Sequence, residues 1–355
     1  MYELSEMKTG KGAYYLFIKD YYKNIIFLYF LYSFSSLVSL STFISFILIP
    51  DLIYVNYISI IIFLLILIII FVLIKINLKL SIKISAIGAF LVVLFILSIS
   101  LILLKNINME FSYFEIHSLD NIFLGGIFSV LVFAGLGSPI SYGDLITNPE
   151  NNLKKSLLIS TLIEGSVFII SSFILGMFLY DHKISININA IIPILDIIKG
   201  FGLLVYKIFI FLLLNSFFTI IILYSISFTR TFHIYINEKL NYEKLLFYIL
   251  IILILISLIS IFKLGPFNTF LLSTSIASVN WLIFHDILNI NLIKIYFKHK
   301  NHMLRKLILP VFSILISLII IFFVLYTESF PFYFSPLSSI IIFLAIFLKN
   351  HGKIK

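Results

Sequence analysis

A run of seventeen residues at positions 58–74, ISIIIFLLILIIIFVLI, constrains the fold of this chain more than any other feature. It is apolar on every face, whether it is drawn as a helix or as a strand. Strands of an outer-membrane barrel alternate apolar and polar residues, so the run excludes that architecture. A transmembrane α-helix needs about 20 predominantly apolar residues, which is close to the length of this run. The run therefore predicts a helix that crosses a membrane.

The composition of the whole chain gives the same indication. The chain is 61% hydrophobic and 12% charged, whereas soluble domains carry about 25% charged residues. A soluble fold could not bury this much apolar surface, so we expect an all-α integral membrane protein. Residues 1–355 are expected to form a single polytopic membrane domain without an inserted soluble domain. The ten predicted spans are residues 25–49, 52–74, 84–104, 122–146, 156–180, 201–228, 245–262, 266–288, 307–326 and 332–348.

Lysine and arginine are distributed unevenly over the loops between these ten segments. Twenty of the 25 fall in one alternating set of loops, which includes both ends of the chain. Basic residues are enriched in cytoplasmic loops. The distribution therefore predicts a multi-pass protein of the cytoplasmic (plasma) membrane with both termini cytoplasmic, and an even number of spans agrees with this.

Helix-breaking residues interrupt the fourth predicted span and its flank, FAGLGSPISYGDLITNPENNLKK. They are Gly135, Gly137, Pro139, Gly143 and Pro149. Glycine and proline weaken a helix by about 1 and 3 kcal/mol relative to alanine. Unpaired backbone groups in hydrocarbon cost several kcal/mol each, so such a break persists where it lines a cavity or binds a ligand. Residues 134–138 are therefore predicted to be unwound, with Pro139 in the first turn of a second half-helix. A kinked packing helix is the alternative.

Four stretches of the chain resemble, in order and in spacing, segments of the amino acid–polyamine–organocation (APC) superfamily of permeases. They are YELSEMKTGKGAYYLFIKDYY at 2–22, NLKLSIKISAIG at 77–88, the interrupted segment at 133–155 and SFTRTFHIYINEK at 227–239. The resemblance covers nearly the whole chain. It implies a five-helix inverted-repeat transporter fold. Its parts would be a partial first repeat at 1–104, a second repeat at 122–290 and two C-terminal helices at 304–349.

The resemblance also implies that helices are missing. Members of the superfamily have twelve helices, and this chain aligns with them from the end of the second. We therefore expect the first helix and most of the second to be missing, because of a misplaced start, a remnant gene or a split protein. The first helix of the family holds the substrate carboxylate, so the chain is expected to lack half of the site and not to accumulate substrate unaided.

The location of the substrate follows from the same resemblance. A substrate amine would meet backbone carbonyls at the break, and Phe133 would help to close the pocket from outside. The implied substrate is an amino acid or a related amine, and the sequence does not indicate which one. The implied substrate-binding residues are Phe133, Ala134, Gly135, Leu136, Gly137 and Ser138.

Five polar residues inside predicted spans are candidates for proton or ion coupling. Glu164 lies about halfway along its span, and carboxylates inside a membrane are costly and often functional. Asn215, Ser216, Ser225 and Ser227 would supply oxygens to a sodium ion, although hydrogen bonding between helices is the simpler interpretation. Proton-coupled members often carry a lysine where this chain has Val92. Sodium coupling, exchange and facilitated diffusion therefore stay open.

Other chemistry is not indicated. The sequence has no cysteine, no zinc-ligand spacing around the adjoining His285 and Asp286, and no Walker A motif. We therefore expect no cofactor, no metal and no enzymatic activity. The basic residues 294–306 lie between two spans and are expected to face anionic lipid rather than nucleic acid.

The leading interpretation is a secondary active transporter (permease) for amino acids or related amines, in contact with the lipid bilayer and coupled to H⁺ or Na⁺ if it is coupled at all. One alternative is a non-transporting nutrient or germinant receptor of the same fold. Another is an inactive, truncated permease. The sequence does not indicate an oligomeric state.

Overall fold

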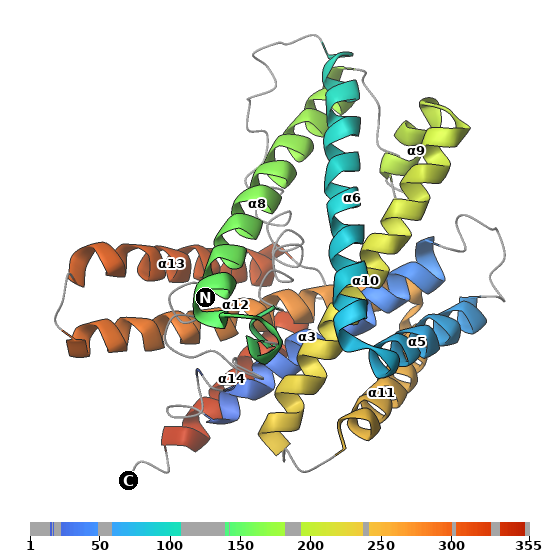
Figure 1. Ribbon diagram of the computed structural model, residues 1–355. Coiled ribbons are helices and arrows are strands. Elements are labelled where there is room, and N and C mark those ends of the chain that lie inside the picture. Colours follow the sequence, from blue (N-terminus) through green and yellow to red (C-terminus); the bar gives the residue numbers. More distant parts are fainter. Residues whose placement is uncertain are drawn as a thin grey trace. The chain divides into compact units, whose positions relative to one another are not determined.

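Regular structure in the described part of the chain is helical. The structure is a computed structural model that describes residues 15, 17, 23–48, 59–107, 139–141, 143–181, 193–236, 241–299, 303–327 and 334–351. Within these residues there is no strand, in agreement with the predicted all-α class. The helices (Figure 1) are η1 (Lys23–Ile25), α3 (Ile26–Thr42), η2 (Phe43–Leu48), α5 (Ser59–Ile76), α6 (Leu78–Leu104), η6 (Gly143–Leu145), α8 (Pro149–Asp181), α9 (Pro193–Gly200), α10 (Leu203–Ile236), α11 (Tyr242–Leu264), α12 (Pro266–His299), α13 (Met303–Thr327) and α14 (Phe334–His351).

Eight helices among the described residues are long and apolar enough to cross a membrane. They are α3 together with η2, α5, α6, α8, α10, α11, α12 and α13. They correspond to eight of the ten predicted spans, and the protein is therefore an all-α, multi-pass membrane protein. The predicted span at 122–146 lies largely outside the described residues. The predicted span at 332–348 corresponds to α14, which is helical but does not belong to the eight.

Several helices extend beyond their predicted ends because polar residues cap or continue them. α6 begins at Leu78 rather than at residue 84, since the Asn77 side chain accepts the backbone N–H of Leu80 at 3.0 Å. α10 continues to Ile236 rather than ending at residue 228, and α12 continues to His299 rather than ending at residue 288. The short helix α9 was not predicted. Hydropathy therefore located the apolar middle of each helix but not its polar ends.

The chain folds into two compact units, each made of segments that are distant in sequence. Unit 1 comprises Met1–Leu40, Ser118–Leu157 and Tyr224–Lys355, and unit 2 comprises Ser41–His117 and Leu158–Leu223. The boundaries between them fall within α3, α8 and α10. The predicted division of the chain into two repeats stays a prediction.

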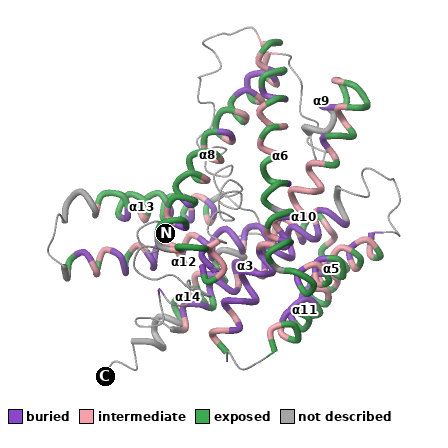
Figure 2. The backbone as a smooth tube through the Cα atoms, viewed as in Figure 1, coloured by how far each residue is buried: buried purple, intermediate pink, exposed green. Residues whose placement is uncertain are grey.

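In unit 1, α12 is the helix against which several others pack. It contacts α11, α13 and α14, and Figure 1 shows α13 running alongside it. α3 is buried along most of its length (Figure 2), with Tyr29, Tyr32 and Leu37 fully or almost fully buried. The ring of Tyr29 lies 5.6 Å from the ring of Phe284 in α12. α3 and α12 therefore contribute to the interior of this unit.

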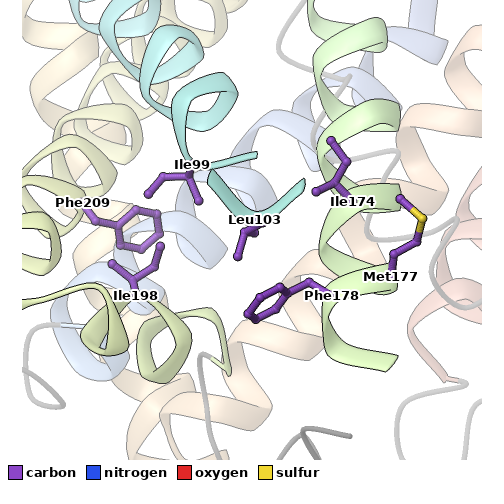
Figure 3. Packing of buried hydrophobic residues seen from close by; sticks show 7 residues of the cluster. All are labelled: Ile99, Leu103, Ile174, Met177, Phe178, Ile198 and Phe209. Atoms are coloured by element: carbon purple, nitrogen blue, oxygen red, sulfur yellow. The ribbon is translucent and has the colours of Figure 1, made fainter. Parts of the chain in front are cut away.

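In unit 2, buried apolar side chains of α6, α8, α9 and α10 form a hydrophobic cluster (Figure 3). Its members are Ile99, Leu103, Ile174, Met177, Phe178, Ile198 and Phe209. On other faces α6 exposes large apolar side chains, among them Ile87 and Phe90. Apolar patches of this extent are unfavourable in water, and they suit contact with lipid tails.

Candidate functional site

The six predicted substrate-binding residues, 133–138, lie outside the described residues. The described residues resume at Pro139, directly after the predicted break. The candidate site therefore consists of residues in the segment that follows the break and in the helices that this segment contacts. All of its residues belong to unit 1.

The segment after the predicted break is not α-helical where it is described. Residues 139–141 and Gly143–Leu145 form short 3₁₀ turns, and Asn148 has a φ of 48°. Pro139 was expected in the first turn of a second half-helix, and it opens a 3₁₀ turn rather than an α-helix. Gly143 and Pro149 leave too few good helix formers between them for an α-helix to propagate. Pro149 instead takes the first position of α8, where its missing N–H is not needed.

A chain of buried hydroxyl groups joins this segment to two helices. The Tyr29 hydroxyl of α3 lies 2.6 Å from Ser227 Oγ of α10, and Ser227 Oγ donates to Ser141 Oγ at 2.7 Å. Thr231 Oγ1, one turn beyond Ser227, lies 3.4 Å from Ser141 Oγ. All four side chains are buried. We refer to Tyr29, Ser141, Ser227 and Thr231 as the hydroxyl cluster.

Arg230 fastens the same segment to α10. Its Nε donates to the backbone oxygen of Ser141 at 3.2 Å, and its Nη2 donates to both carboxylate oxygens of Asp144. The Arg230 side chain is 7% exposed, whereas that of Asp144 is 39% exposed. Arg230 follows the predicted span 201–228 and was therefore expected in the loop after it. It lies in α10 instead, because that helix continues to Ile236.

Polar contacts continue along α3 beyond the hydroxyl cluster. The Tyr32 hydroxyl is hydrogen-bonded to the Tyr224 hydroxyl of α10, and its ring centroid lies 4.3 Å from that of Trp281 in α12. Further along, Ser39 Oγ lies 2.7 Å from Thr274 Oγ1 of α12. Within unit 1, α3 therefore meets both neighbouring helices through polar groups as well as through aromatic rings.

Several buried hydroxyls on α3 and α10 have no hydrogen-bond partner among the described residues. They include Ser33 Oγ, Ser225 Oγ and Thr229 Oγ1, and all three side chains are 0% exposed. Ser33 lies one turn along α3 from Tyr29. Ser225 and Thr229 lie one turn apart on the face of α10 opposite Ser227 and Thr231. A buried polar group without a partner costs about 1–3 kcal/mol. A bound water, ion or substrate at these oxygens would recover that free energy.

The five predicted coupling residues are not all in one unit. Ser225 and Ser227 belong to unit 1, where Ser225 is one of these buried hydroxyls and Ser227 is part of the hydroxyl cluster. Glu164 is half-buried in α8, within unit 2. Asn215 and Ser216 are half-buried in the part of α10 that belongs to unit 2. Their roles in coupling stay a prediction.

Asn215 packs directly against Gly88 of α6. A Cβ atom added at Gly88 would overlap the Asn215 side-chain amide. We therefore expect Gly88→Ala to displace that amide and to lower the free energy of unfolding by about 1–2 kcal/mol, as overpacking does elsewhere. Unfolding in mixed micelles with increasing SDS measures the change.

Gly176→Ala in α8 is the matched control for this substitution. No atom lies within 4 Å of a Cβ added at Gly176. In a helix interior alanine is favoured over glycine by about 0.5–1 kcal/mol, so the control is expected to be stabilising. If the two variants changed stability equally, the close packing of Gly88 on Asn215 would be contradicted.

The sequence analysis did not propose Tyr29, Ser141 or Arg230 as site residues. A signal for part of the site was present, because Asp144 and Arg230 carry opposite charges at ends of spans predicted to lie on the same side of the membrane. Ser227 was a candidate oxygen ligand for sodium, but Tyr29 and Ser141 carried no such signal, since serine and tyrosine are common throughout the chain.

Comparison with known proteins adds no assignment, because no family model and no curated protein matches the chain. Within the described residues, no group of three or more His, Cys, Asp and Glu side chains is placed to hold a metal ion. The site is thus defined by its own geometry, as a buried set of hydroxyls beside irregular backbone in a multi-pass membrane protein.

Proposed function

We propose that the protein is a secondary active transporter for amino acids or related amines. It has the five-helix inverted-repeat fold and lies in the cytoplasmic membrane with both termini cytoplasmic. The observation that carries the proposal is the hydroxyl cluster, through which the irregular backbone at 139–141 is joined to α10 and, by way of Ser227, to α3. Irregular backbone among membrane helices is tolerated where it is buried in protein or lines a cavity, and transporters bind their substrates at such segments.

The unpartnered hydroxyls on α3 and α10 favour an amine as the ligand. An ammonium group has hydrogen-bond donors and no acceptor, so it needs oxygens around it. The buried hydroxyls of Ser33, Ser225 and Thr229 are oxygens without partners among the described residues. An anion would need a cation instead, and Arg230 is already bound to Asp144.

The resemblance to the APC superfamily supports the same substrate class and the repeat fold. It places the predicted break immediately before Pro139, so the carbonyls at 133–135 would lie next in sequence to the segment that carries Ser141. In this proposal the substrate amine binds between the break and the unpartnered Ser33 hydroxyl. Ser225 remains a candidate for ion coupling.

Replacing Tyr29 with phenylalanine is expected to weaken amino acid binding by about tenfold. The substitution keeps the ring, but it removes the hydroxyl that joins α3 to Ser227. A lost buried hydrogen bond costs about 1–2 kcal/mol, and 1.4 kcal/mol corresponds to a factor of ten in affinity. Equilibrium binding of radiolabelled leucine, arginine and alanine to the chain in nanodiscs measures the change.

Tyr248→Phe is the matched control, because Tyr248 is 60% exposed on α11. Binding is expected to be unchanged in this variant. Equal weakening in both variants, or no binding of any tested amino acid by the unmodified chain, would oppose the proposed site. Uptake into proteoliposomes then separates the alternatives, since a permease transports, a receptor binds without transport, and an inactive permease does neither.

A further inference from the structure

Asp286 is a carboxylate buried at a helix–helix contact in unit 1, apart from the hydroxyl cluster. It lies on α12, is 9% exposed, and faces α13, where Ser317 Oγ donates to its Oδ2 at 2.7 Å. One turn further along, Asn289 Nδ2 donates to Ser313 Oγ at 3.1 Å. The two hydrogen bonds show that α12 and α13 run antiparallel along this contact.

The contact lies deep in the membrane if α13 spans it. Ser317 is close to the middle of the apolar span Leu307–Tyr326, which has 20 residues. A helix rises about 1.5 Å per residue, so each end of that span is about 15 Å away along the axis. The Asp286 carboxylate is therefore placed opposite the centre of a membrane helix rather than near the headgroups.

One oxygen of the Asp286 carboxylate has no partner among the residues that the structure describes. Its Oδ1 atom is buried and accepts no hydrogen bond from any described residue. An ionised carboxylate is acceptor-only and needs donors or a cation at both oxygens, while a protonated carboxyl needs fewer. Burying an unpaired charge is so unfavourable that a buried group neutralises itself instead.

The helices packed against Asp286 bring no described counter-charge to it. On α12, the neighbouring His285 turns its Nδ1 to the Trp281 carbonyl at 3.0 Å, and Lys294 lies about 12 Å further along the axis. By sequence, α13 has no charged residue between Leu307 and Tyr326. The ionisable residues of α11 are in its terminal turns apart from the exposed Tyr248, and those of α14 are Lys349 and His351 at its end.

On the α3 side, the titratable groups are Tyr29 and Tyr32. They face Phe284 and Trp281 of α12, and their hydroxyls are bonded to Ser227 and Tyr224. They therefore do not serve as partners of the carboxylate. A proton is the simplest cation that would satisfy the site, because it needs no room and no further ligands.

We propose that Asp286 is a proton-binding site within the contact between α12 and α13. The carboxylate takes up a proton from water to become the neutral acid, with its O–H on Oδ1, and returns the same proton to water when α12 and α13 separate. Ser317 stabilises the ionised form by donating to Oδ2. The coupling of this proton to substrate movement rests on the proposed transport function, whereas the proton binding itself does not.

The test uses dicyclohexylcarbodiimide, a membrane-soluble reagent that modifies protonated carboxyl groups. An ordinary carboxyl is protonated to only about one part in 10³ at pH 7. The 355-residue chain in liposomes is expected to be labelled at Asp286 at pH 7, at least about tenfold faster than at Asp144, as read by mass spectrometry of the two peptides. Asp286→Asn is expected to lose the label from that peptide.

A second variant tests the role of the serine. Ser317→Ala removes the donor to the ionised form, so labelling of Asp286 is expected to persist to higher pH than in the unmodified chain. The proposal is overturned if native Asp286 is unlabelled at every pH while the same peptide in SDS-unfolded protein is labelled at acid pH. It is also overturned if Ser317→Ala leaves the pH profile unmoved.

The labelling readout does not depend on transport. If amino acid binding and uptake fail while Asp286 is labelled as expected, the proposed function fails and the proton site stands. If uptake occurs but Asp286 does not hold a proton, the proton site fails and the proposed function stands. Where both succeed, Asp286→Asn is expected to abolish accumulation driven by a pH gradient, and retention of that accumulation would exclude a coupling role.

Discussion

Replacing Asp144 with alanine is expected to lower the free energy of unfolding by about 3 kcal/mol. The substitution leaves the Arg230 guanidinium, which is 7% exposed, without its carboxylate. Breaking a buried ion pair costs about 3–5 kcal/mol, and the lower end applies because Asp144 itself is 39% exposed. Unfolding of the chain in SDS mixed micelles measures the change.

The asymmetry of this ion pair makes the prediction sharper. Arg230→Met removes the buried charge and leaves Asp144 able to reach water, so it is expected to cost only about 1–2 kcal/mol. Adding Arg230→Met to Asp144→Ala is expected to restore part of the lost stability, because the orphaned cation is gone. Glu243→Ala, at an exposed carboxylate in the first turn of α11, is the control, with an expected cost of at most about 1 kcal/mol. A cost for Arg230→Met equal to or above that for Asp144→Ala would contradict a buried arginine.

Replacing Phe284 with alanine is expected to have an effect of similar or greater size. Its side chain is 0% exposed in α12 and packs against Tyr29 of α3. Truncating a buried phenylalanine to alanine costs about 3–5 kcal/mol, through lost contacts and the cavity that remains. The same unfolding assay reports the loss, and amino acid binding is expected to weaken with it, because Tyr29 loses a neighbour that positions it.

Phe262→Ala in α11 is the matched control for this truncation. Phe262 is 75% exposed, so its contacts with the rest of the protein are few. A substitution at such a surface position is expected to change stability by about 0.5 kcal/mol or less. If Phe262→Ala cost as much as Phe284→Ala, the assignment of α12 to the interior of unit 1 would be wrong.

The eight described spans could be predicted because each is a long apolar run, and apolar length is a local property of sequence. The ends of these helices were harder to predict from the sequence. Asn77 caps α6 and Pro149 starts α8 through local backbone geometry that hydropathy does not measure. The 3₁₀ turns at 139–141 and 143–145 were not predicted, because the glycines and prolines indicated a break at 134–138, which lies outside the described residues.

The site was harder to predict than the fold. The hydrogen bond from Ser227 to Ser141 joins residues 86 positions apart, and that from Tyr29 to Ser227 joins residues 198 positions apart. A serine or tyrosine inside an apolar run looks the same in sequence whether it bonds its own helix, as Ser98 does to Leu94, or a distant one. Only the tertiary arrangement separates these cases, which is why Tyr29 was missed. Ser225 was proposed together with the other polar residues of its predicted span.

α12 makes three side-chain hydrogen bonds to neighbouring helices. Thr274 is bonded to Ser39 of α3, Asn280 donates to Ser339 of α14, and Asp286 accepts from Ser317 of α13. At 3.6 residues per turn these three positions point in directions roughly 120° apart around the helix axis. Turning α12 about its axis in either sense would strain all three hydrogen bonds at once. The three bonds together therefore fix the rotational orientation of the helix. Losing one of the three, as when α12 and α13 separate and the bond from Ser317 to Asp286 breaks, would free the helix to turn about the two that remain.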